Sequence, residues 1–351
     1  MRAEPLLKII MQAANAAVGK ARDIGLVLSG GGAKGAYQAG VWKSLVESGV
    51  ANRIAAISGT SVGAINAAAF AAVWNPDRIR DIWHQHVSSV VSPNLKALSP
   101  LMVLEAISLW ADGKAFPLHG LLDRDKVADV LSKALPTTWS GEIPSIYATS
   151  LQIQDNASDE FDRASYRAVR FHIDEERDPS RRRSEILASC AIPWCYSPVE
   201  IDGKRHVDGG WDEMGGENVP LSPILENHPE IKTVVVVRCN SADLEPEPLR
   251  NRCRENLRVV EIRPRRPLPG IFDMANLGGG MLSGTLPFGV SDFLPASAIA
   301  SALGGFFASS RAKIWGATLA FSPRFTDIYF QRGYENGLDV LSEKLLATTQ
   351  I

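Results

Sequence analysis

The fold of the chain is best predicted from one stretch, Ile57-Ser58-Gly59-Thr60-Ser61-Val62-Gly63-Ala64-Ile65-Asn66-Ala67. Its centre, Gly59 to Gly63, matches G-x-S-x-G, the pattern of a nucleophile elbow. The apolar run Ile54-Ala55-Ala56-Ile57 before it predicts a short buried strand. The alanine-rich run from Ala64 to Ala72 after it predicts a helix.

Ser61 is the candidate nucleophile in this strand–turn–helix. Gly59 and Gly63 leave room for neighbouring backbone to pass, because neither carries a Cβ. The serine hydroxyl is then presented at a helix N-terminus, where free N–H groups and the helix dipole favour developing negative charge. The five-residue pattern alone leaves a bystander serine open, but the flanking strand and helix favour a catalytic one.

The size and composition are those of a globular protein. The 351 residues, 45% apolar and 22% charged, suffice for one large or two ordinary domains. A net charge of -2 gives no reason to expect a nucleic-acid partner. The cysteines at positions 190, 195, 239 and 253 form no metal-ligand spacing, so we expect no zinc site. They favour a reducing, cytoplasmic compartment, with disulfides as the alternative.

The chain divides into an N-terminal segment and one catalytic domain. Residues 1–21 mix apolar and basic side chains and predict an amphipathic segment, because a signal peptide needs a cleaner apolar core. Residues 22–346 are expected to form the domain, with an apolar Gly/Pro-rich insertion at 263–325. No charge-free apolar run reaches 18 residues, so no membrane-spanning helix is expected.

The first elements of the domain predict its fold class. The apolar run Ile24 to Leu28 is followed by the glycine-rich turn Gly30 to Gly35 and by a helical pattern over 37–48. With the strand at 54–57 this makes a βαβ unit with parallel strands. The alternation predicts an α/β sandwich around a mainly parallel sheet.

Later elements follow from periodicity and turn signals. Helices are predicted over 75–90, 102–110, 122–135, 184–190 and 333–346, and strands over 145–151, 233–237, 257–262 and 327–330. Residues 199–207 predict a hairpin with an Asp-Gly turn that leads to Asp208. The polar stretch 153–184, with its arginine triplet at 181–183, is expected to be an exposed connection.

The loop from Gly30 to Gly35 admits three interpretations. A P-loop would need Ser or Thr after its lysine, but Gly35 follows Lys34. A dinucleotide-binding fingerprint fits Gly30, Gly32 and Gly35, yet no acidic residue ends the second strand. The third is an oxyanion hole, because successive glycine N–H groups at a helix N-terminus point at one spot.

A nucleophilic serine also needs a base. The α/β-hydrolase order Ser…Asp…His fails, because the last histidine, His228, lies far from the C-terminus and the elbow follows only two strands. Asp208 remains as a candidate, although Asp-Gly is common in ordinary turns. An aspartate with a pKa near ~3.9 is a poor base unless burial raises the pKa or the hydroxyl is held in contact.

Taken in order, these motifs resemble those of patatin-like phospholipases. The resemblance rests on Gly30-Gly31-Gly32-Ala33-Lys34-Gly35, Gly59-Thr60-Ser61-Val62-Gly63, Asp208-Gly209-Gly210, Ala188–Pro193 leading to Ser197-Pro198-Val199, and Arg332-Gly333-Tyr334-Glu335. It covers residues 22–262 and 326–346. It implies a three-layer α/β/α sandwich with a Ser-Asp dyad.

The resemblance also implies roles for individual residues. Ser61 would be the nucleophile and Asp208 its base, without metal or other cofactor. The N–H groups of the Gly30-Gly31-Gly32 loop would bind the oxyanion, and Lys34, where the family commonly has arginine, would orient the loop or favour an anionic head group. Gly59, Gly63, Gly209 and Gly210 would support the two motifs. Ser29 departs from the family, many of whose members have aspartate there.

The expected function is that of a lipid acyl hydrolase. The resemblance implies cleavage of phospholipid or lysophospholipid esters through an acyl-serine, with peripheral membrane contact. Alternatives are an acyltransferase or thioesterase using the same acyl-serine, and a non-catalytic lipid-binding regulatory module. The 263–325 insertion, flanked by three arginines, is expected to cap an acyl groove or contact a membrane, with a buried core insertion as the alternative.

Overall fold

The computed structural model describes residues 22–88, 122–139, 141–155, 162–193, 195–243, 256–269 and 321–346. Within these ranges one sheet has the order β5-β6-β3-β2-β1-β7-β8, with β4 paired to β3. The strands are β1 (Ile24–Leu28), β2 (Ile54–Thr60), β3 (Ser145–Ile153), β4 (Tyr166–His172), β5 (Val199–Ile201), β6 (Lys204–Asp208), β7 (Thr233–Val237) and β8 (Arg258–Ile262). Pairing is parallel from β3 across to β8 and antiparallel among β3, β4, β5 and β6.

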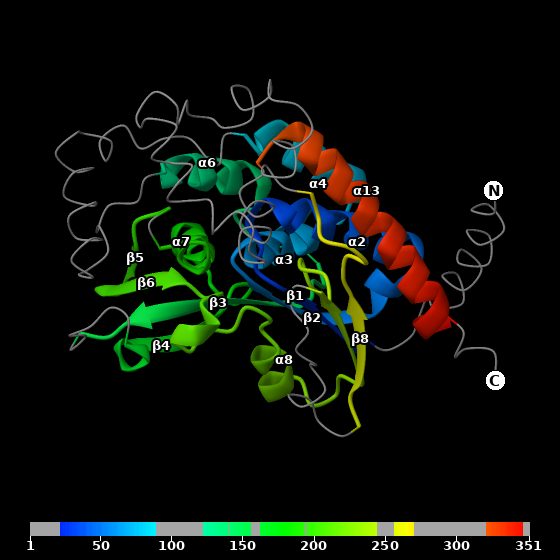
Figure 1. Cartoon of the computed structure of the whole chain (residues 1–351). Coiled ribbons are helices and arrows are strands. Elements are labelled where there is room, and N and C mark those ends of the chain that lie inside the picture. Colours follow the sequence, from blue (N-terminus) through cyan, green and yellow to red (C-terminus); the bar gives the residue numbers. More distant parts are fainter. Residues whose placement is uncertain are drawn as a thin grey trace.

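Helices flank this sheet (Figure 1). They are α2 (Gly35–Glu47), α3 (Val62–Val73), α4 (Pro76–His86), α6 (Arg124–Ala134), α7 (Pro179–Ser189), α8 (Ser222–Asn227) and α13 (Pro323–Val340), which a π-helical turn, Leu341–Leu346, extends. Alternate residues of a strand serve different layers: Leu26 and Leu28 pack in the larger core cluster, and Val27 in the smaller one. The fold is therefore the expected α/β sandwich.

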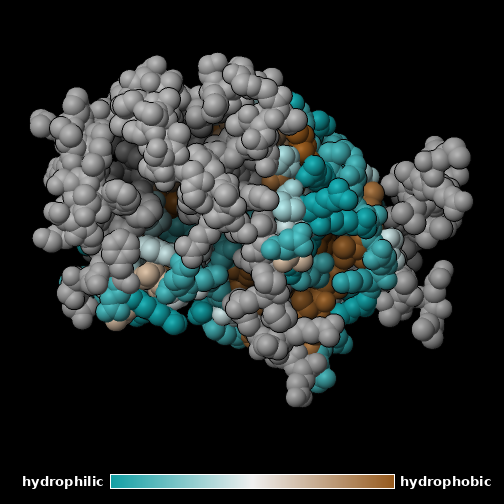
Figure 2. Space-filling model, viewed as in Figure 1, coloured by the Kyte–Doolittle hydropathy of each residue, from teal (hydrophilic) through white to brown (hydrophobic). Residues whose placement is uncertain are grey.

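The central strands are buried throughout, as their sequences predict. Every residue of β1 and β7 is buried, which explains their continuous apolar runs. On the face shown in Figure 2 the described surface over α13 is mostly hydrophilic. Among the described residues Trp74 is the one large hydrophobic side chain that is exposed, at 37%. No helix in the described ranges is long and apolar enough to cross a membrane.

The strands β2 and β6 both pair with β3, and their last residues lie side by side at the candidate site. β4 pairs with β3 over Tyr147 to Ile153, so β2 and β6 must share the other edge of β3. Thr60, the last residue of β2, pairs with Thr149, and Asp208, the last residue of β6, pairs with the next residue, Ser150. Both strands therefore end at the same point of the sheet.

The structure corrects the prediction for residues 153–184. This stretch contains the strand β4 and the first two turns of α7 rather than an exposed connection alone. β4 has polar residues because it is only partly buried along its length. Arg182 of the arginine triplet is 3% exposed and donates hydrogen bonds to the carbonyl oxygens of Pro136, Thr137 and Glu176, so it is a buried structural residue.

The strand predicted at 327–330 is also wrong. These residues lie inside α13, which begins ten residues before Gly333, at Pro323. Residues 323–325 therefore belong to this helix, not to the insertion expected at 263–325. At its other end Leu268 is buried, and Arg265 pairs with Asp339 of α13 at 2.8 Å. The segments 1–21, 102–110 and 270–320 lie outside the described residues.

Candidate active site

Ser61 stands on a sharp turn between β2 and α3. Its backbone has φ 56° and ψ -127°, a conformation that a residue with a side chain rarely adopts. The turn is tight enough to require glycine on both sides: a Cβ at Gly59 would lie 2.1 Å from the Gly63 carbonyl oxygen, and one at Gly63 would lie 2.3 Å from that of Leu28. This is the geometry that the G-x-S-x-G pattern predicts.

Asp208 ends β6 and is 6% exposed. Its Oδ1 accepts a hydrogen bond from the Gly210 N–H at 2.7 Å. Its buried Oδ2 has no hydrogen-bond partner among the described residues. Burial raises the pKa of Asp208 to about 6, although the nearby Ser61 hydroxyl and the hydrogen bond from the Gly210 N–H lower it in part. The carboxyl group thus lies near the Ser61 hydroxyl, and its Oδ2 has no hydrogen-bond partner among the described residues.

The glycine-rich loop lies against the same serine. A Cβ at Gly30 would be 3.4 Å from Cβ of Ser61. The Gly30 N–H donates to the Asn218 carbonyl at 3.0 Å and is therefore occupied. Gly32, with φ 56°, lines the same pocket as Ser61. Gly31 caps and Gly32 begins the short 3-10 turn, Gly32–Lys34, that leads into α2, so their N–H groups lie at a helix N-terminus beside Ser61.

Two residues beside this loop have structural contacts. The hydroxyl of Ser29 donates to the Gly30 carbonyl and accepts the Cys239 N–H, both at 3.0 Å, which ties the loop to the end of β7. Lys34 is 2% exposed, and its Nζ donates to Asn240 Oδ1 at 2.6 Å. That position suits orientation of the loop more than contact with a head group.

The segment after Asp208 contains site residues that the sequence reasoning missed. The carbonyl of Gly209 accepts the Glu217 N–H at 2.8 Å, and the Glu217 carbonyl accepts the Thr60 hydroxyl at 2.7 Å. Asn218 holds Gly30 through its carbonyl. These contacts connect the aspartate loop, the elbow and the glycine loop. No motif marks them, because most act through backbone atoms that any residue carries.

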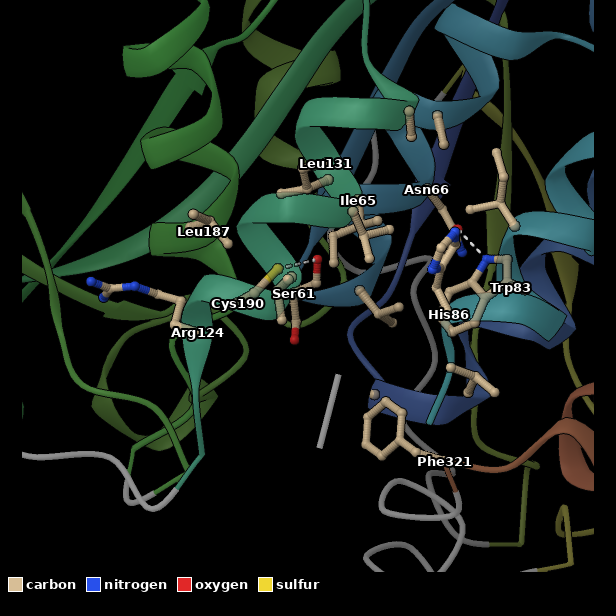
Figure 3. Close-up of a pocket in the computed structure, with 18 of the residues that line it drawn as sticks. Ser61, Ile65, Asn66, Trp83, His86, Arg124, Leu131, Leu187, Cys190 and Phe321 are labelled. Atoms are coloured by element: carbon tan, nitrogen blue, oxygen red, sulfur yellow. Dashed lines mark hydrogen bonds between the residues drawn. The ribbon is translucent and has the colours of Figure 1, made fainter. Parts of the chain in front are cut away.

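An apolar pocket opens at Ser61 (Figure 3). Its walls come from α3, α4, α6 and the end of α7, with Ile65, Trp83, Leu131 and Leu187, and from Phe321 just before α13. Ile65 and Ala69 follow Ser61 at intervals of four residues, so the pocket runs along α3 away from the serine. Such a pocket is suited to a hydrocarbon chain whose end lies at Ser61.

Two polar residues of the pocket lining, Arg124 and Asn66, are held by hydrogen bonds. The guanidinium of Arg124 donates to the carbonyls of Ser197 and Pro198 and points away from Ser61 in Figure 3. Asn66 accepts from Trp83 Nε1 at 3.0 Å and donates to the Gly35 carbonyl at 2.9 Å. The described ranges hold no group of three or more metal-ligating side chains. The arrangement places a serine hydroxyl, a buried carboxyl group and a glycine-rich loop beside an apolar pocket.

Comparison with known proteins identifies a family that matches this chain. A family model described as Patatin-like phospholipase matches residues 26–229, more than half of the chain. Lysophospholipase nte1 of Aspergillus terreus is 54% identical over 50 residues, which are 14% of this chain and 3% of that protein.

Several solved structures are also similar in part. Human GIVD cytosolic phospholipase A2 is 11% identical with a TM-score of 0.47, over 98% of this chain and 63% of that one. ExoU of Pseudomonas aeruginosa, in its complex with SpcU, is 17% identical with a TM-score of 0.37, over 93% and 52% of the two chains. The chain therefore spans less than two thirds of these structures and a small part of the fungal relative.

Proposed function

Since this chain belongs to the patatin-like phospholipase family, we propose that it hydrolyses carboxylic esters of phospholipids or lysophospholipids through an acyl-serine on Ser61. One observation carries the proposal more than any other. The Ser61 hydroxyl is close enough to the buried carboxyl group of Asp208 to lower its pKa, and Ser61 also lines an apolar pocket, which supports the pairing of the two residues. A phospholipid substrate lies in a membrane, so the proposal implies peripheral contact with one.

Acylation would use three groups of this chain. The Ser61 oxygen attacks the acyl carbonyl carbon while Asp208 accepts the hydroxyl proton. The N–H groups of Gly31 and Gly32 donate to the resulting oxyanion. The carbon–oxygen bond to the alcohol then breaks, and the alcohol leaves with the proton from Asp208.

Deacylation would repeat these steps with water. Asp208 accepts a proton from the attacking water, the oxyanion forms again at the glycine loop, and the fatty acid leaves as Ser61 regains its proton. A pKa of about 6 suits this role, because the carboxyl group is ionised at neutral pH yet a stronger base than an exposed aspartate.

Ser61→Ala tests the proposal. We expect the turnover of phosphatidylcholine and lysophosphatidylcholine, read by mass spectrometry, to fall by about 1000-fold or more, because the nucleophile is removed. Ser58→Ala is the matched control: Ser58 is a buried serine of β2 whose hydroxyl makes no hydrogen bond with the described residues. Turnover retained in Ser61→Ala would contradict the mechanism.

The same assay separates hydrolysis from acyl transfer. An alcohol acceptor such as glycerol, added in excess, would discharge the acyl-serine to a new ester if the protein were a transferase. We expect free fatty acid as the main product with and without glycerol. A wild-type protein that binds vesicles without turnover would instead indicate a lipid-binding module.

A further inference from the structure

Three consecutive residues at the end of α7 bind the backbone of both dyad members. The N–H of Ser61 donates to Ser189 Oγ at 2.9 Å, and the thiol of Cys190 donates to the Ser61 carbonyl at 3.1 Å. The N–H of Asp208 donates to the carbonyl of Ala191 at 2.9 Å. We propose that residues 189–191 form a positioning bridge that sets the geometry of Ser61 and Asp208. Its catalytic consequence rests on the function proposed above.

The bridge holds the strained backbone of the elbow in place. Ser61 occupies a backbone conformation that costs about 1–3 kcal/mol for a residue with a side chain. Such strain persists only where surrounding contacts hold it. The first turn of α3 holds the Ser61 carbonyl through the Ala64 N–H at 2.9 Å. The Ile65 N–H also donates to this carbonyl, at 3.4 Å, and the bridge adds the Cys190 thiol as a side-chain donor and supplies the acceptor for the Ser61 N–H.

Ser189 can do this because its hydroxyl is itself fixed. It is fully buried, and it donates to the Thr149 carbonyl at 2.5 Å while it accepts from Ser61. Thr149 lies on β3, directly beside Thr60. One hydroxyl therefore joins the elbow to the strand on which β2 and β6 converge. A hydroxyl is needed, because the position requires a donor and an acceptor on one atom.

Cys190 acts as a neutral donor in this bridge. Burial and the nearby charge of Asp208 raise its pKa well above the ordinary thiol value, so the thiol keeps its proton. Its side chain lines the acyl pocket beside Ser61, and Figure 3 shows it directed at the serine backbone. The thiol therefore reaches Ser61 without competing as a nucleophile.

The helix that carries the bridge is anchored at both ends. Asp178 caps its N-terminus by accepting the Ser180 N–H at 2.9 Å, and Arg182 fixes its first turns to three carbonyls. Its last residues, Ile186 and Ala188, are fully buried. A positioning group on such a support is held more accurately than one on a free loop.

Variants of the two side chains test the bridge with a fluorophosphonate probe and a short-chain ester. We expect Ser189→Ala to lower kcat and the labelling rate of Ser61 by about 10- to 100-fold, because small misplacements of reacting groups are costly. KM should change less than about twofold. Ser44→Ala, which removes a buried serine hydroxyl within α2, is the control for stability.

The Cys190 pair separates hydrogen bonding from packing. Cys190→Ala should lower kcat about 3- to 10-fold, the effect of one hydrogen bond, and Cys190→Ser should restore it to within about twofold. Cys195→Ala, a nearby half-buried thiol, should leave kcat unchanged. If Cys190→Ser is as slow as Cys190→Ala, or if Ser189→Ala loses stability but not kcat, the bridge is overturned.

Crystal structures of the wild type and Ser189→Ala test the bridge independently of activity, because they show the backbone conformation of Ser61 directly. We expect Ser61 to leave the positive-φ conformation in the variant. An unchanged Ser61 backbone would overturn the proposal, whatever the activity. If the wild type is neither labelled nor active, the proposed function fails, while this structural readout still decides the bridge.

Discussion

At the scale of single residues, Asp208, the base in the proposed mechanism, must satisfy two opposing requirements. A general base must be ionised, yet the site buries its carboxyl group and raises its pKa to about 6. Between the ordinary pKa of 3.8 and about 6, the folded protein holds a proton that the unfolded chain has lost. Stability therefore falls as the pH rises through this window and stays lower above it.

Asp208→Asn tests this cost. We expect the variant to be more stable than the wild type at pH 8 by about 1–3 kcal/mol, because the amide needs no ionisation and its oxygen can still accept from Gly210. At pH 4 the difference should shrink, since the wild-type carboxyl group is then protonated. Urea unfolding at both pH values measures it, and equal stability gains at the two values would refute the explanation.

The activity of the wild type should follow the same group. We expect kcat/KM for a short-chain ester to decrease tenfold per pH unit well below about 6, as the base is protonated, and to level off above it. A pH–rate profile from 4 to 8 measures this. A flat profile through pH 6 would show that another group limits the rate, and no substitution is needed to see it.

The sequence was sufficient to predict the sharp turn at Ser61 and the glycine-rich turn before α2, because the spacing of glycines indicates local turns. The placement of Asp208 against Ser61 needed the resemblance, since 146 residues separate the two and spacing alone does not bring them together. Ser189 and Glu217 were not predicted as site residues. Their contacts are hydrogen bonds to backbone that leave no pattern in the sequence.

At the scale of elements, α13 shows how packing overrides local preference. Its run Asp327-Ile328-Tyr329-Phe330 is rich in residues that favour strands, which explains the wrong prediction. In the structure Tyr329 and Phe330 are buried within one long helix against α2. That contact depends on Gly40 and Gly333, where the two helices approach closely.

Gly333→Ala should therefore destabilise the fold although alanine is the better helix former. An added Cβ would lie 2.0 Å from the carbonyl oxygen of Tyr37, so the helices must separate. We expect a loss of about 1–3 kcal/mol in urea unfolding, as for other overpacked contacts. Gln331→Ala, on the exposed side of the same helix, is the control and should change stability by less than about 0.5 kcal/mol. Unchanged or increased stability of Gly333→Ala would show that α2 and α13 can move apart at this contact at little cost in the free energy of unfolding.

At the scale of the whole molecule, the site exists where distant segments meet. The βαβ unit and the buried strands predicted the parallel half of the sheet, because their hydrophobic runs are long and simple. The convergence of β2 and β6 on one edge of β3 could not be predicted, since register is set by the whole sheet. The pocket likewise depends on α4 and α6, whose apolar faces gave no indication of a shared cavity.

The direction of that pocket gives the last prediction. Ala69 lies eight residues after Ser61 on the same face of α3, so it is about 12 Å further along the helix axis. Ala69→Phe should obstruct the pocket there, while the space beside Ser61 stays open. We expect kcat/KM for a hexadecanoyl ester to fall about 10-fold or more, and that for a butanoyl ester to stay within about twofold, because only the longer chain reaches this point.

Ala72→Phe makes the same substitution in the same helix at a partly buried position outside the pocket lining, so it controls for effects on α3 itself. A chain-length series from butanoyl to hexadecanoyl should show a break for Ala69→Phe and none for Ala72→Phe. A uniform loss over all lengths would mean that the variant disturbs the dyad. Unchanged use of the longest chain would mean that the acyl group leaves Ser61 in another direction, and the pocket along α3 would then not be the acyl site.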